Sequence, residues 1–327
     1  MQAAFYGRQG PAQEVFQFGE QPTPVPSAGE VRVRLQTSGV NPSDWKVRKG
    51  GFNRPLMAPI IIPHSDGAGV IDAVGAGVSA SRVGERVWVW NGQWKRPFGT
   101  AAQYIALPSS QAVRMPDSLD FAQGACLGIP ALTAMQAVRL VNAHAGMRVL
   151  VAGGAGAVGH YAIQMAKARG ATVLTTVSGE AKAQHARAAG ADHVIYYKSE
   201  DVGARVKELT GGTGVDAVIE MDLSRNAALY PQILRPHATV AVYGMSENES
   251  TLFSLWLMQN SITLRFFLIY EISAEDRQAG LTELDALLSQ DRLTHTVAMR
   301  LPLTQAARAH DVVEEGNLIG NVVLDID

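Results

Sequence analysis

A strand, a glycine-rich turn and a helix follow one another in RVLVAGGAGAVGHYAIQMAKARG, residues 148–170. The apolar run ending in Val151 predicts a buried strand, and the turn after it has the spacing Gly154-x-Gly156-x-x-Gly159. We expect Gly154 to permit a tight turn, Gly156 to let the backbone approach a pyrophosphate and Gly159 to let the helix pack on the strand. The free N–H groups of the helix's first turn then face the negative charge. This pattern predicts a dinucleotide-binding unit.

Short apolar strands and helices continue to alternate after this unit. Further strands are predicted at 171–177, 193–197, 215–221, 238–244 and 262–269. Strands that alternate with helices in this way are typical of a parallel, doubly wound sheet. We therefore expect an α/β fold with a Rossmann domain over residues 123–267.

The first part of the chain has a different pattern. In EVRVRLQTSGV, residues 30–40, Arg32 and Arg34 alternate with apolar residues, which is the period of a strand with one buried face. Several such strands, separated by glycine and proline, predict a compact, partly open β barrel. The elements after the sixth strand are too few to form a domain of their own. The barrel domain is therefore predicted to be discontinuous, over 1–122 and 268–327.

The second strand of the dinucleotide unit runs into TTVSGEAK, where an NAD-binding unit has Asp or Glu for the ribose 2′-hydroxyl. Ser178 and Gly179 leave room there for a 2′-phosphate, and Lys182 supplies a cation. Tyr197, at the end of the third strand, adds a hydroxyl at the same edge. Glu180 is the opposing observation, and we place it on the solvent side of the next helix, where an acid suits the helix dipole. The sequence favours NADPH over NADH.

Charge and cysteine content exclude other classes of protein. The formal net charge of −2 gives no footprint for nucleic acid. The single cysteine, Cys126, excludes an internal disulfide framework and a zinc site with several thiolates. The N-terminus lacks an apolar signal segment, and the longest apolar stretch, 253–270, is interrupted by Gln259, Asn260 and Arg265. We expect neither nucleic acid nor a membrane as partner, and a cytoplasmic location.

Seven segments together carry a resemblance to a known family: GVNPSDWKVRKG, PHSDGAGVIDAVGAGV, GERVWVW, GIPALTAMQAV, VLVAGGAGAVG, GVDAVIEM and GNVVLDI. They resemble the medium-chain dehydrogenase/reductase superfamily, and within it the zinc-free quinone oxidoreductase (zeta-crystallin-like) branch. The resemblance implies a GroES-like barrel plus a Rossmann domain, with NADPH in the cleft between them. It also implies a homodimer joined through the edges of the Rossmann sheets. Members of the branch reduce quinones, or conjugated enones and enals.

The resemblance also bears on zinc. Zinc-dependent relatives have a cysteine ligand where residues 40–42 stand, and a His-Glu pair where the segment HSDGAG stands. Alignment on its glycines puts Ser65 at the His position and Asp66 at the Glu position, with His64 offset by one. A catalytic zinc needs about three protein ligands, so no metal is expected.

The segment NPSD contains the candidate catalytic groups. The resemblance places Asn41 and Asp44 near the nicotinamide. An asparagine amide can donate to an oxygen on which negative charge develops, and Asp44 would orient a donor or relay a proton through water. Lys46, preceded by Trp45, departs from the tyrosine that is common in the branch. It serves as an electrophile, binds an acidic substrate or is merely solvated, and we include it in the predicted catalytic set.

Further cofactor contacts are expected from the resemblance and from the sheet. The resemblance places Thr133 beside the nicotinamide amide and Asn321 in the region that reaches the cleft. Gly244 and Ser246 follow the fifth strand, at the edge where doubly wound sheets bind ligands. Residues 267–269 either wall the nicotinamide pocket or belong to the core. The predicted cofactor contacts are Asn41, Thr133, Gly154, Gly156, Ala157, Val158, Gly159, Ser178, Gly179, Lys182, Tyr197, Gly244, Ser246, Phe267, Leu268, Ile269 and Asn321.

Together these features predict an NADPH-dependent quinone oxidoreductase that transfers hydride without zinc. Reduction of the C=C bond of enones, enals or enoyl thioesters is an alternative, because Lys46 departs from the quinone-reducing pattern. A catalytically silent, crystallin-like NADPH-binding protein is a second alternative, because no unmistakable catalytic acid is present.

Overall fold

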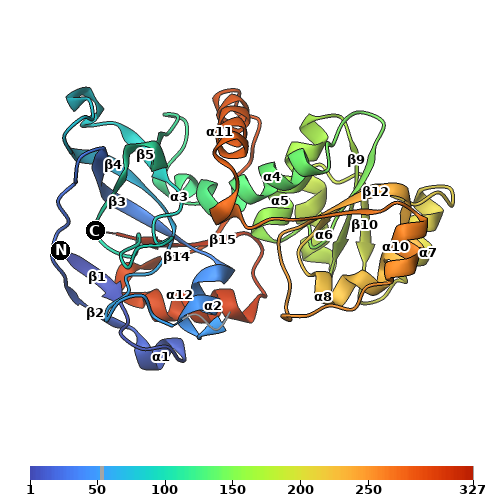
Figure 1. Ribbon diagram of the computed structural model, residues 1–327, viewed down its shortest axis with the longest axis horizontal. Helices are drawn as coiled ribbons and strands as arrows, with labels where there is room; N and C mark the ends of the chain where they lie inside the picture. Colours follow the sequence, from blue (N-terminus) through green and yellow to red (C-terminus); the bar gives the residue numbers. More distant parts are fainter. Residues whose placement is uncertain (52–54, 327) are drawn as a thin grey trace. The chain divides into compact units, whose positions relative to one another are not determined.

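The computed structural model describes residues 1–51 and 55–326. The chain forms two compact units (Figure 1). The first unit consists of Met1–Pro130 and His295–Asp327, and the second of Ala131–Thr294. Within the described residues, no helix is both long and apolar enough to span a lipid bilayer.

The first unit is built on a seven-stranded sheet with the order β14-β15-β3-β4-β5-β7, in which β6 also pairs with β3, and a two-stranded sheet β1-β2. Its strands are β1 (Gln2–Phe5), β2 (Gln17–Glu20), β3 (Glu30–Val40), β4 (Asp66–Val74), β5 (Arg86–Val89), β6 (Tyr104–Pro108), β7 (Ala112–Arg114), β14 (Val297–Pro302) and β15 (Asn321–Asp325). Its helices are α1 (Ala12–Val15), α2 (Pro42–Arg48), α3 (Phe121–Gly124) and α12 (Ala306–Glu315), with short 3-10 turns η2 (Ala80–Arg82), η3 (Ser109–Gln111) and η7 (Leu303–Gln305).

The predicted alternation along β3 is confirmed. Val31, Val33 and Leu35 are buried in the core, whereas Arg32 and Arg34 are not. Because β3 pairs with β4, β6 and β15, it is the central strand of the unit. It runs directly into α2, so the start of that helix has a fixed place.

The second unit is a six-stranded parallel sheet in the order β10-β9-β8-β11-β12-β13, and the predicted doubly wound fold is confirmed. Its strands are β8 (Arg148–Val151), β9 (Thr172–Val177), β10 (His193–Tyr196), β11 (Val215–Glu220), β12 (Leu234–Val242) and β13 (Thr263–Phe266). Its helices are α4 (Leu132–Leu140), α5 (Ala157–Ala168), α6 (Glu180–Ala188), α7 (Val202–Leu209), α8 (Leu223–Asn226), α9 (Tyr230–Ile233), α10 (Ser254–Gln259) and α11 (Ala274–Ser289), with 3-10 turns η5 (Ala227–Leu229) and η6 (Ile269–Glu271). Figure 1 shows helices on both faces of this sheet.

The units divide at other residues than the sequence predicts. The chain returns to the first unit at His295 rather than at 268, because α11 packs on α4 and Arg139 pairs with Glu283. The first unit extends past residue 122 to Pro130, because α3 packs on β3 and β4.

The sixth strand of the second unit is shorter than predicted. It ends at Phe266, so residues 267–269 follow the strand instead of ending it, and η6 begins at Ile269. Phe267 still donates its backbone N–H to the carbonyl of Val242. Beyond that bond the segment is no longer part of the sheet.

Candidate functional site

The glycine-rich turn after β8 differs in detail from the prediction. The left-handed backbone is at Gly153, with φ of 68°, and not at Gly154. Gly154 is required for close packing, since a Cβ there would lie 2.1 Å from Thr175 Oγ1. A Cβ at Gly159 would lie 2.4 Å from the Gly153 carbonyl oxygen. As predicted from the motif, Gly159 allows α5 to pack against the turn.

Two other glycines at this edge have no such packing reason. Gly156 caps α5 and is exposed, and a Cβ there would meet nothing closer than the Gly153 oxygen at 3.4 Å. Gly179 caps α6, and a Cβ there would meet nothing within 4 Å. The first-turn N–H groups of α5, including those of Ala157 and Val158, have no preceding helical carbonyl. This open space at two helix N-termini fits an anionic group such as a pyrophosphate.

The acid at this edge is paired within the protein. The Tyr196 hydroxyl donates to Glu180, and Arg187 Nη1 lies 3.2 Å from the same carboxylate. The hydrogen bond from Tyr196 is the main cause that lowers the pKa of Glu180, and Arg187 acts in the same direction. Lys182 is half-buried, and the Tyr197 side chain is 51% exposed. The negative charge of Glu180, which would repel a 2′-phosphate, is therefore balanced by Arg187.

The loops after β11 and β12 are tied to each other. A Cβ at Gly244 would lie 2.2 Å from the Met221 carbonyl oxygen, so close backbone packing requires this glycine. The N–H and hydroxyl of Ser246 both donate to Asp222 Oδ1 at 3.0 Å. The Ser246 side chain thus already has an acceptor. Beyond β13, Leu268 is 45% exposed and Ile269 is buried.

Two polar atoms on α4 are buried without a partner. Thr133 Oγ1 and Gln136 Oε1 make no hydrogen bond within residues 1–51 and 55–326. They lie one helical turn apart, on one face of α4. Buried polar atoms normally have partners, so this face of α4 fits an amide-bearing ligand group.

In the first unit, the residues of NPSD form a buried polar cluster with Asp66. Asn41 precedes α2, and its backbone N–H donates to Asp44 Oδ2 at 2.7 Å. The Asn41 side-chain amide donates to Asp66 Oδ2, also at 2.7 Å. The backbone N–H of Ile129 donates to both oxygens of Asp66, at 2.9 and 2.8 Å. One N–H of the predicted catalytic amide is thus bound to a carboxylate.

Burial dominates the electrostatics of this cluster. It raises the pKa of Asp44 to about 7, against the lowering effect of the Asn41 backbone N–H. Burial also raises the pKa of Asp66 well above its ordinary value, the donors Ile129 and Asn41 opposing it and the charge of Asp44 adding to it. Both carboxyls accept from Asn41, and burial favours the neutral form of each.

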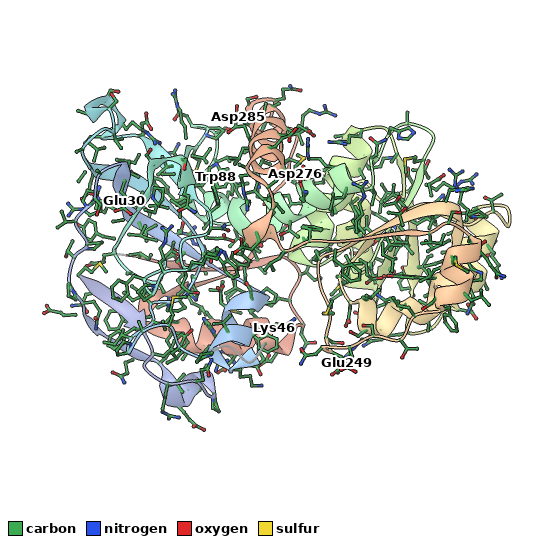
Figure 2. The ribbon with its side chains drawn as sticks, viewed as in Figure 1. Glu30, Lys46, Trp88, Glu249, Asp276 and Asp285 are labelled. Carbon is green, nitrogen blue, oxygen red and sulfur yellow. The ribbon has the colours of Figure 1, made fainter. Side chains whose placement is uncertain are left out.

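Lys46 lies on α2, and Figure 2 labels it there. Its Nζ and that of Lys49 each lie 5.8 Å from the ring centroid of Trp45. Trp45 is only half-buried. The two lysines thus lie near the ring, and Lys49 is also paired with Glu314.

The structure adds buried groups that sequence reasoning did not select. Arg48, His64 and His310 are all 0% exposed, and the two histidine Nε2 atoms lie 2.9 Å apart. The segment PHSDG draws attention to His64, but only as a possible metal ligand. Arg48 and His310 are single polar positions on two helices, and only the tertiary fold brings them together.

Known proteins match both units. A model of the alcohol dehydrogenase GroES-like domain matches residues 27–117, and a model of zinc-binding dehydrogenases matches 157–286. The quinone oxidoreductase of Rattus norvegicus is 30% identical over 303 residues, covering 92% of this chain and 90% of that protein. The chain belongs to the quinone oxidoreductase-like group of the medium-chain dehydrogenase/reductase superfamily.

Two further relatives of this superfamily member are informative. The 2-haloacrylate reductase of Burkholderia sp. is 31% identical over 340 residues, covering 99% of this chain and 98% of that protein. A mycobacterial protein solved in complex with NADPH has a TM-score of 0.87 at 31% identity, covering 99% of this chain and 100% of that one.

Two positions that align with zinc ligands of the superfamily are Ser65 and Asp66. Asp66 accepts from Asn41 and Ile129, as described above, and Ser65 is buried beside it. Among the residues that the structure describes, no three His, Cys, Asp or Glu side chains are grouped to hold a metal ion. Asn321, at the start of β15, donates its backbone and side-chain N–H groups to the Thr296 carbonyl, at 2.8 and 3.0 Å.

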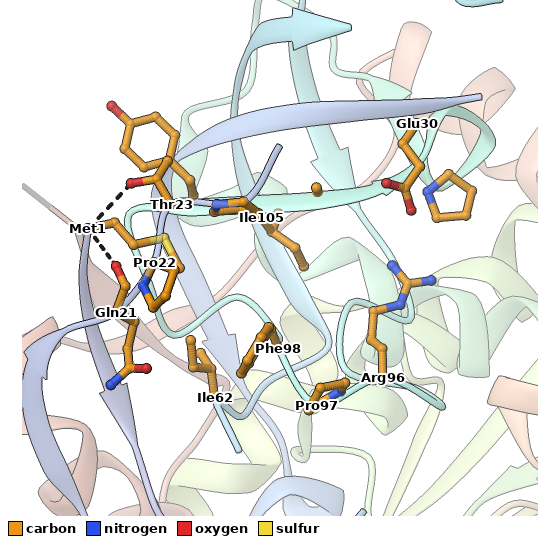
Figure 3. Close-up of a pocket in the computed structure, with 14 residues that line it drawn as sticks. Met1, Gln21, Pro22, Thr23, Glu30, Ile62, Arg96, Pro97, Phe98 and Ile105 are labelled. Atoms are coloured by element: carbon orange, nitrogen blue, oxygen red, sulfur yellow. Dashed lines mark hydrogen bonds between the residues drawn. The ribbon is translucent and has the colours of Figure 1, made fainter. Parts of the chain in front are cut away.

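A cavity of about 370 Å³ lies elsewhere in the first unit (Figure 3). Its wall includes Ile62, Phe98, Arg96 and Glu30. Glu30 is the first residue of β3, whereas Asn41 follows the last. The cavity therefore lies at the opposite end of the strand, and no predicted site residue lines it.

Proposed function

We propose that this chain is a zinc-independent, NADPH-dependent quinone oxidoreductase. The observation that carries the cofactor assignment is the open edge at Gly156 and Gly179, beside Lys182 and with Glu180 paired to Arg187. The mycobacterial relative solved with NADPH and the curated quinone oxidoreductases support the same assignment. The exposed hydroxyl of Tyr197 is assigned to the 2′-phosphate together with Lys182, because Tyr196 is already bound to Glu180.

Bound NADPH would supply a hydride, and the oxygen of the acceptor would then carry developing negative charge. Asn41 has two amide N–H groups, and we assign the one that does not bind Asp66 to that oxygen. Asp44 holds the backbone of Asn41, and its pKa of about 7 suits a group that exchanges a proton near neutral pH. Thr133 is assigned to the nicotinamide amide because its buried hydroxyl lacks a protein partner. Asn321 is assigned a cofactor contact only through its second amide N–H.

Reduction of an activated C=C bond is the second candidate. The 2-haloacrylate reductase matches almost the full length of this chain, and an acrylate is an anion. Lys46, whose Nζ lies 5.8 Å from the ring centroid of Trp45, would suit an acidic substrate of this kind, whereas Lys49 is paired with Glu314. We retain Lys46 as an electrophile or a substrate-binding group.

One assay separates these functions. NADPH oxidation would be followed with quinones, enals, enones, a 2-haloacrylate and an enoyl thioester, each also with NADH. Turnover of quinones above the others supports the main proposal, and preference for the acrylate or thioester supports C=C reduction. Tight NADPH binding without turnover of any acceptor would favour the catalytically silent alternative.

Zinc independence has its own test. The protein would be purified without chelator, and its metal content and activity measured before and after dialysis against chelator. We expect less than stoichiometric zinc and unchanged activity. One tightly held zinc per chain, with activity lost on its removal, would contradict the proposal.

The proposed homodimer forms through the edge of the second unit's sheet. β13 is one of the two edge strands, with Phe266 55% exposed, and Leu255 and Met258 of α10 are 63% and 70% exposed. An exposed apolar edge strand is a template for pairing with a second copy. Phe266→Lys is expected to convert the dimer to monomer in light scattering. Val25→Lys, at an apolar residue 80% exposed in the first unit, is the matched control and should remain dimeric.

The proposal includes a cytoplasmic location. Cys126, the only cysteine of the sequence, is a buried free thiol that donates to the Ala122 carbonyl. The fold therefore uses no disulfide and suits a reducing compartment. Cell fractionation that recovers the protein with the membranes or outside the cell would contradict this part.

A further inference from the structure

Six residues of the first unit form a continuous chain of buried hydrogen bonds. Arg48 Nε donates to His310 Nδ1 at 3.3 Å, and His310 Nε2 lies 2.9 Å from His64 Nε2. His64 Nδ1 then lies 2.9 Å from Ser38 Oγ, which lies 2.8 Å from Thr100 Oγ1. Thr100 donates to the backbone carbonyl of Asp66. The chain thus starts on α2 and ends at the first residue of β4.

Its two ends fix the direction of every bond in the chain. An arginine can only donate, and a backbone carbonyl can only accept. His310 Nδ1 must therefore be unprotonated, so its proton is on Nε2 and is donated to His64 Nε2. The proton of His64 is then on Nδ1 and is donated to Ser38. Each ring has one allowed neutral tautomer.

Burial supports this assignment. It lowers the pKa of His64 to about 3, and burial, His64 and Arg48 hold the pKa of His310 well below its ordinary value. A second proton on His64 would set two N–H groups against each other at 2.9 Å, and one on His310 would set its Nδ1–H against the Nε–H of Arg48 at 3.3 Å. The charged groups near the chain include Glu314, which pairs with Arg48 at 3.0 Å and also with Lys49, and the buried carboxyl of Asp44. Both rings are therefore neutral.

Hydrogen bonds connect both ends of α2 to Asp66. Asn41, before the helix, binds the carboxylate of Asp66, while Arg48, at its end, leads through the chain to the carbonyl of the same residue. The backbone at His64 is held in the left-handed region, with φ of 77°, which a non-glycine residue adopts only when its surroundings enforce it. The position of Asp66 is thus set by hydrogen bonds from both ends of α2.

We infer that Arg48, His310 and His64 are positioning residues, which fix Asp66 and through it the side-chain amide of Asn41 by a hydrogen-bond chain with a single direction. This inference rests on the proposed function, because Asn41 is the assigned donor to the acceptor oxygen. A ring flip or a change of tautomer at His310 would reverse or break the chain. The amide would then be held less accurately where charge develops.

The first experiment reads the tautomers directly in the unmodified protein. Nitrogen-15 NMR of the histidine side chains at pH 7 is expected to show His64 neutral with its proton on Nδ1, and His310 neutral with its proton on Nε2. A cationic ring, or a proton on Nε2 of His64, would overturn the inference. This measurement needs no substrate, so its outcome does not depend on the proposed function.

The second experiment compares two substitutions of one residue. The amide of His310→Gln can accept from Arg48 and donate to His64, whereas His310→Leu can do neither. We expect His310→Leu to lower kcat roughly tenfold to a hundredfold, with the Kd for NADPH unchanged, and His310→Gln to restore most of kcat. Circular dichroism and NADPH titration show whether each variant is folded.

The outcomes separate the inference from the proposed function. Full kcat in His310→Leu, or equal losses in both folded variants, would overturn the positioning role while the reductase activity stands. If no acceptor is reduced by the unmodified protein, the proposed function fails, and the positioning role fails with it. If His310→Leu does not fold, the tautomers from NMR and the kcat of His310→Gln decide.

Discussion

Two arrangements of polar groups, one in each unit, differ in whether their hydrogen bonds are complete. In the first unit, Arg48, His64 and His310 are fully buried and bind one another. In the second unit, the helix caps at Gly156 and Gly179 are open, and the buried hydroxyl of Thr133 has no partner in the described chain. The first arrangement is complete without a ligand. The second leaves groups unpaired that a bound nucleotide would satisfy.

The difference shows what each unit contributes. A closed network of buried hydrogen bonds keeps a few side chains in one geometry, which is what a donor to a developing charge requires. An open edge with free N–H groups and a cation does not fix its side chains in this way, but it can bind an anionic ligand.

The largest expected effect contrasts two glycines. A Cβ at Gly128 would lie 2.1 Å from Asp66 Oδ1 and 3.0 Å from the Val89 carbonyl, whereas one at Gly156 would be unhindered. Gly128→Ala should therefore lower the free energy of unfolding by about 3 kcal/mol. Gly156→Ala should cost less than about 1 kcal/mol, as a change of cap residue, but should weaken NADPH binding.

Urea unfolding and NADPH titration of both variants check this contrast. Equal losses of stability would show that the turn at Gly156 is as tightly packed as the one at Gly128. Unchanged NADPH affinity in Gly156→Ala would remove the argument that this glycine leaves room for a pyrophosphate.

A second contrast lies within the buried network and depends on pH. The pKa of Asp44 is raised from 3.8 to about 7, so between these values the folded chain holds a proton that the unfolded chain has lost. Stability contributed by Asp44 therefore falls as pH rises through this window, by up to about 1.4 kcal/mol per pH unit. The pKa of His64 is lowered from 6.5 to about 3, so its contribution falls as pH drops through that range.

The two effects oppose each other in the unmodified protein. Asp44→Asn removes the first and leaves the second, so its stability should rise with pH between about 4 and 6.5 more steeply than that of the parent. Urea midpoints measured across this range test it. Parallel curves for the two proteins would mean that Asp44 has an ordinary pKa.

The same contrast explains how far the sequence could predict the molecule. The doubly wound sheet and the glycine-rich edge follow local rules, because strand–helix alternation and turn spacing are written in consecutive residues. The bond from Asn41 to Asp66 and the pair His64–His310 join residues far apart in the chain. No local sequence pattern predicts contacts between such distant residues, so the buried network could be identified only from the three-dimensional structure.

One detail of the open edge differs from the prediction. The motif puts the tight turn at Gly154, but the preceding Gly153 takes the left-handed conformation. Both positions require glycine, because a Cβ at Gly153 would lie 2.2 Å from Met221 Sδ and a Cβ at Gly154 would lie 2.1 Å from Thr175 Oγ1, contacts that the fold makes and the motif does not contain. Composition alone does not distinguish Tyr196 from its neighbour Tyr197. Alternation along the strand end turns Tyr196 toward Glu180.

The third prediction concerns the choice of nucleotide at the open edge. Lys182→Ala should weaken NADPH binding about tenfold, since it removes a charge-assisted contact to the 2′-phosphate, and should leave NADH binding unchanged. Lys207→Ala, at an exposed lysine on α7, is the control and should affect neither. Fluorescence titration with both nucleotides gives the four comparisons. A similar loss for NADH and NADPH would mean that Lys182 does not read the 2′-phosphate.

The smallest expected effect is on the stability of a variant at Thr133, the buried residue of the second unit whose hydroxyl has no partner in the described chain. Thr133→Val keeps the shape of the side chain and removes the buried hydroxyl that has no partner in the described chain. Without nucleotide, the variant should be more stable by about 1 kcal/mol, because an unsatisfied polar group is gone. With saturating NADPH the sign should reverse, since the unmodified protein gains a hydrogen bond that the variant lacks. Thermal unfolding with and without NADPH measures both. A variant that is destabilised in both states would show that Thr133 has a protein partner and that its hydroxyl is part of the core.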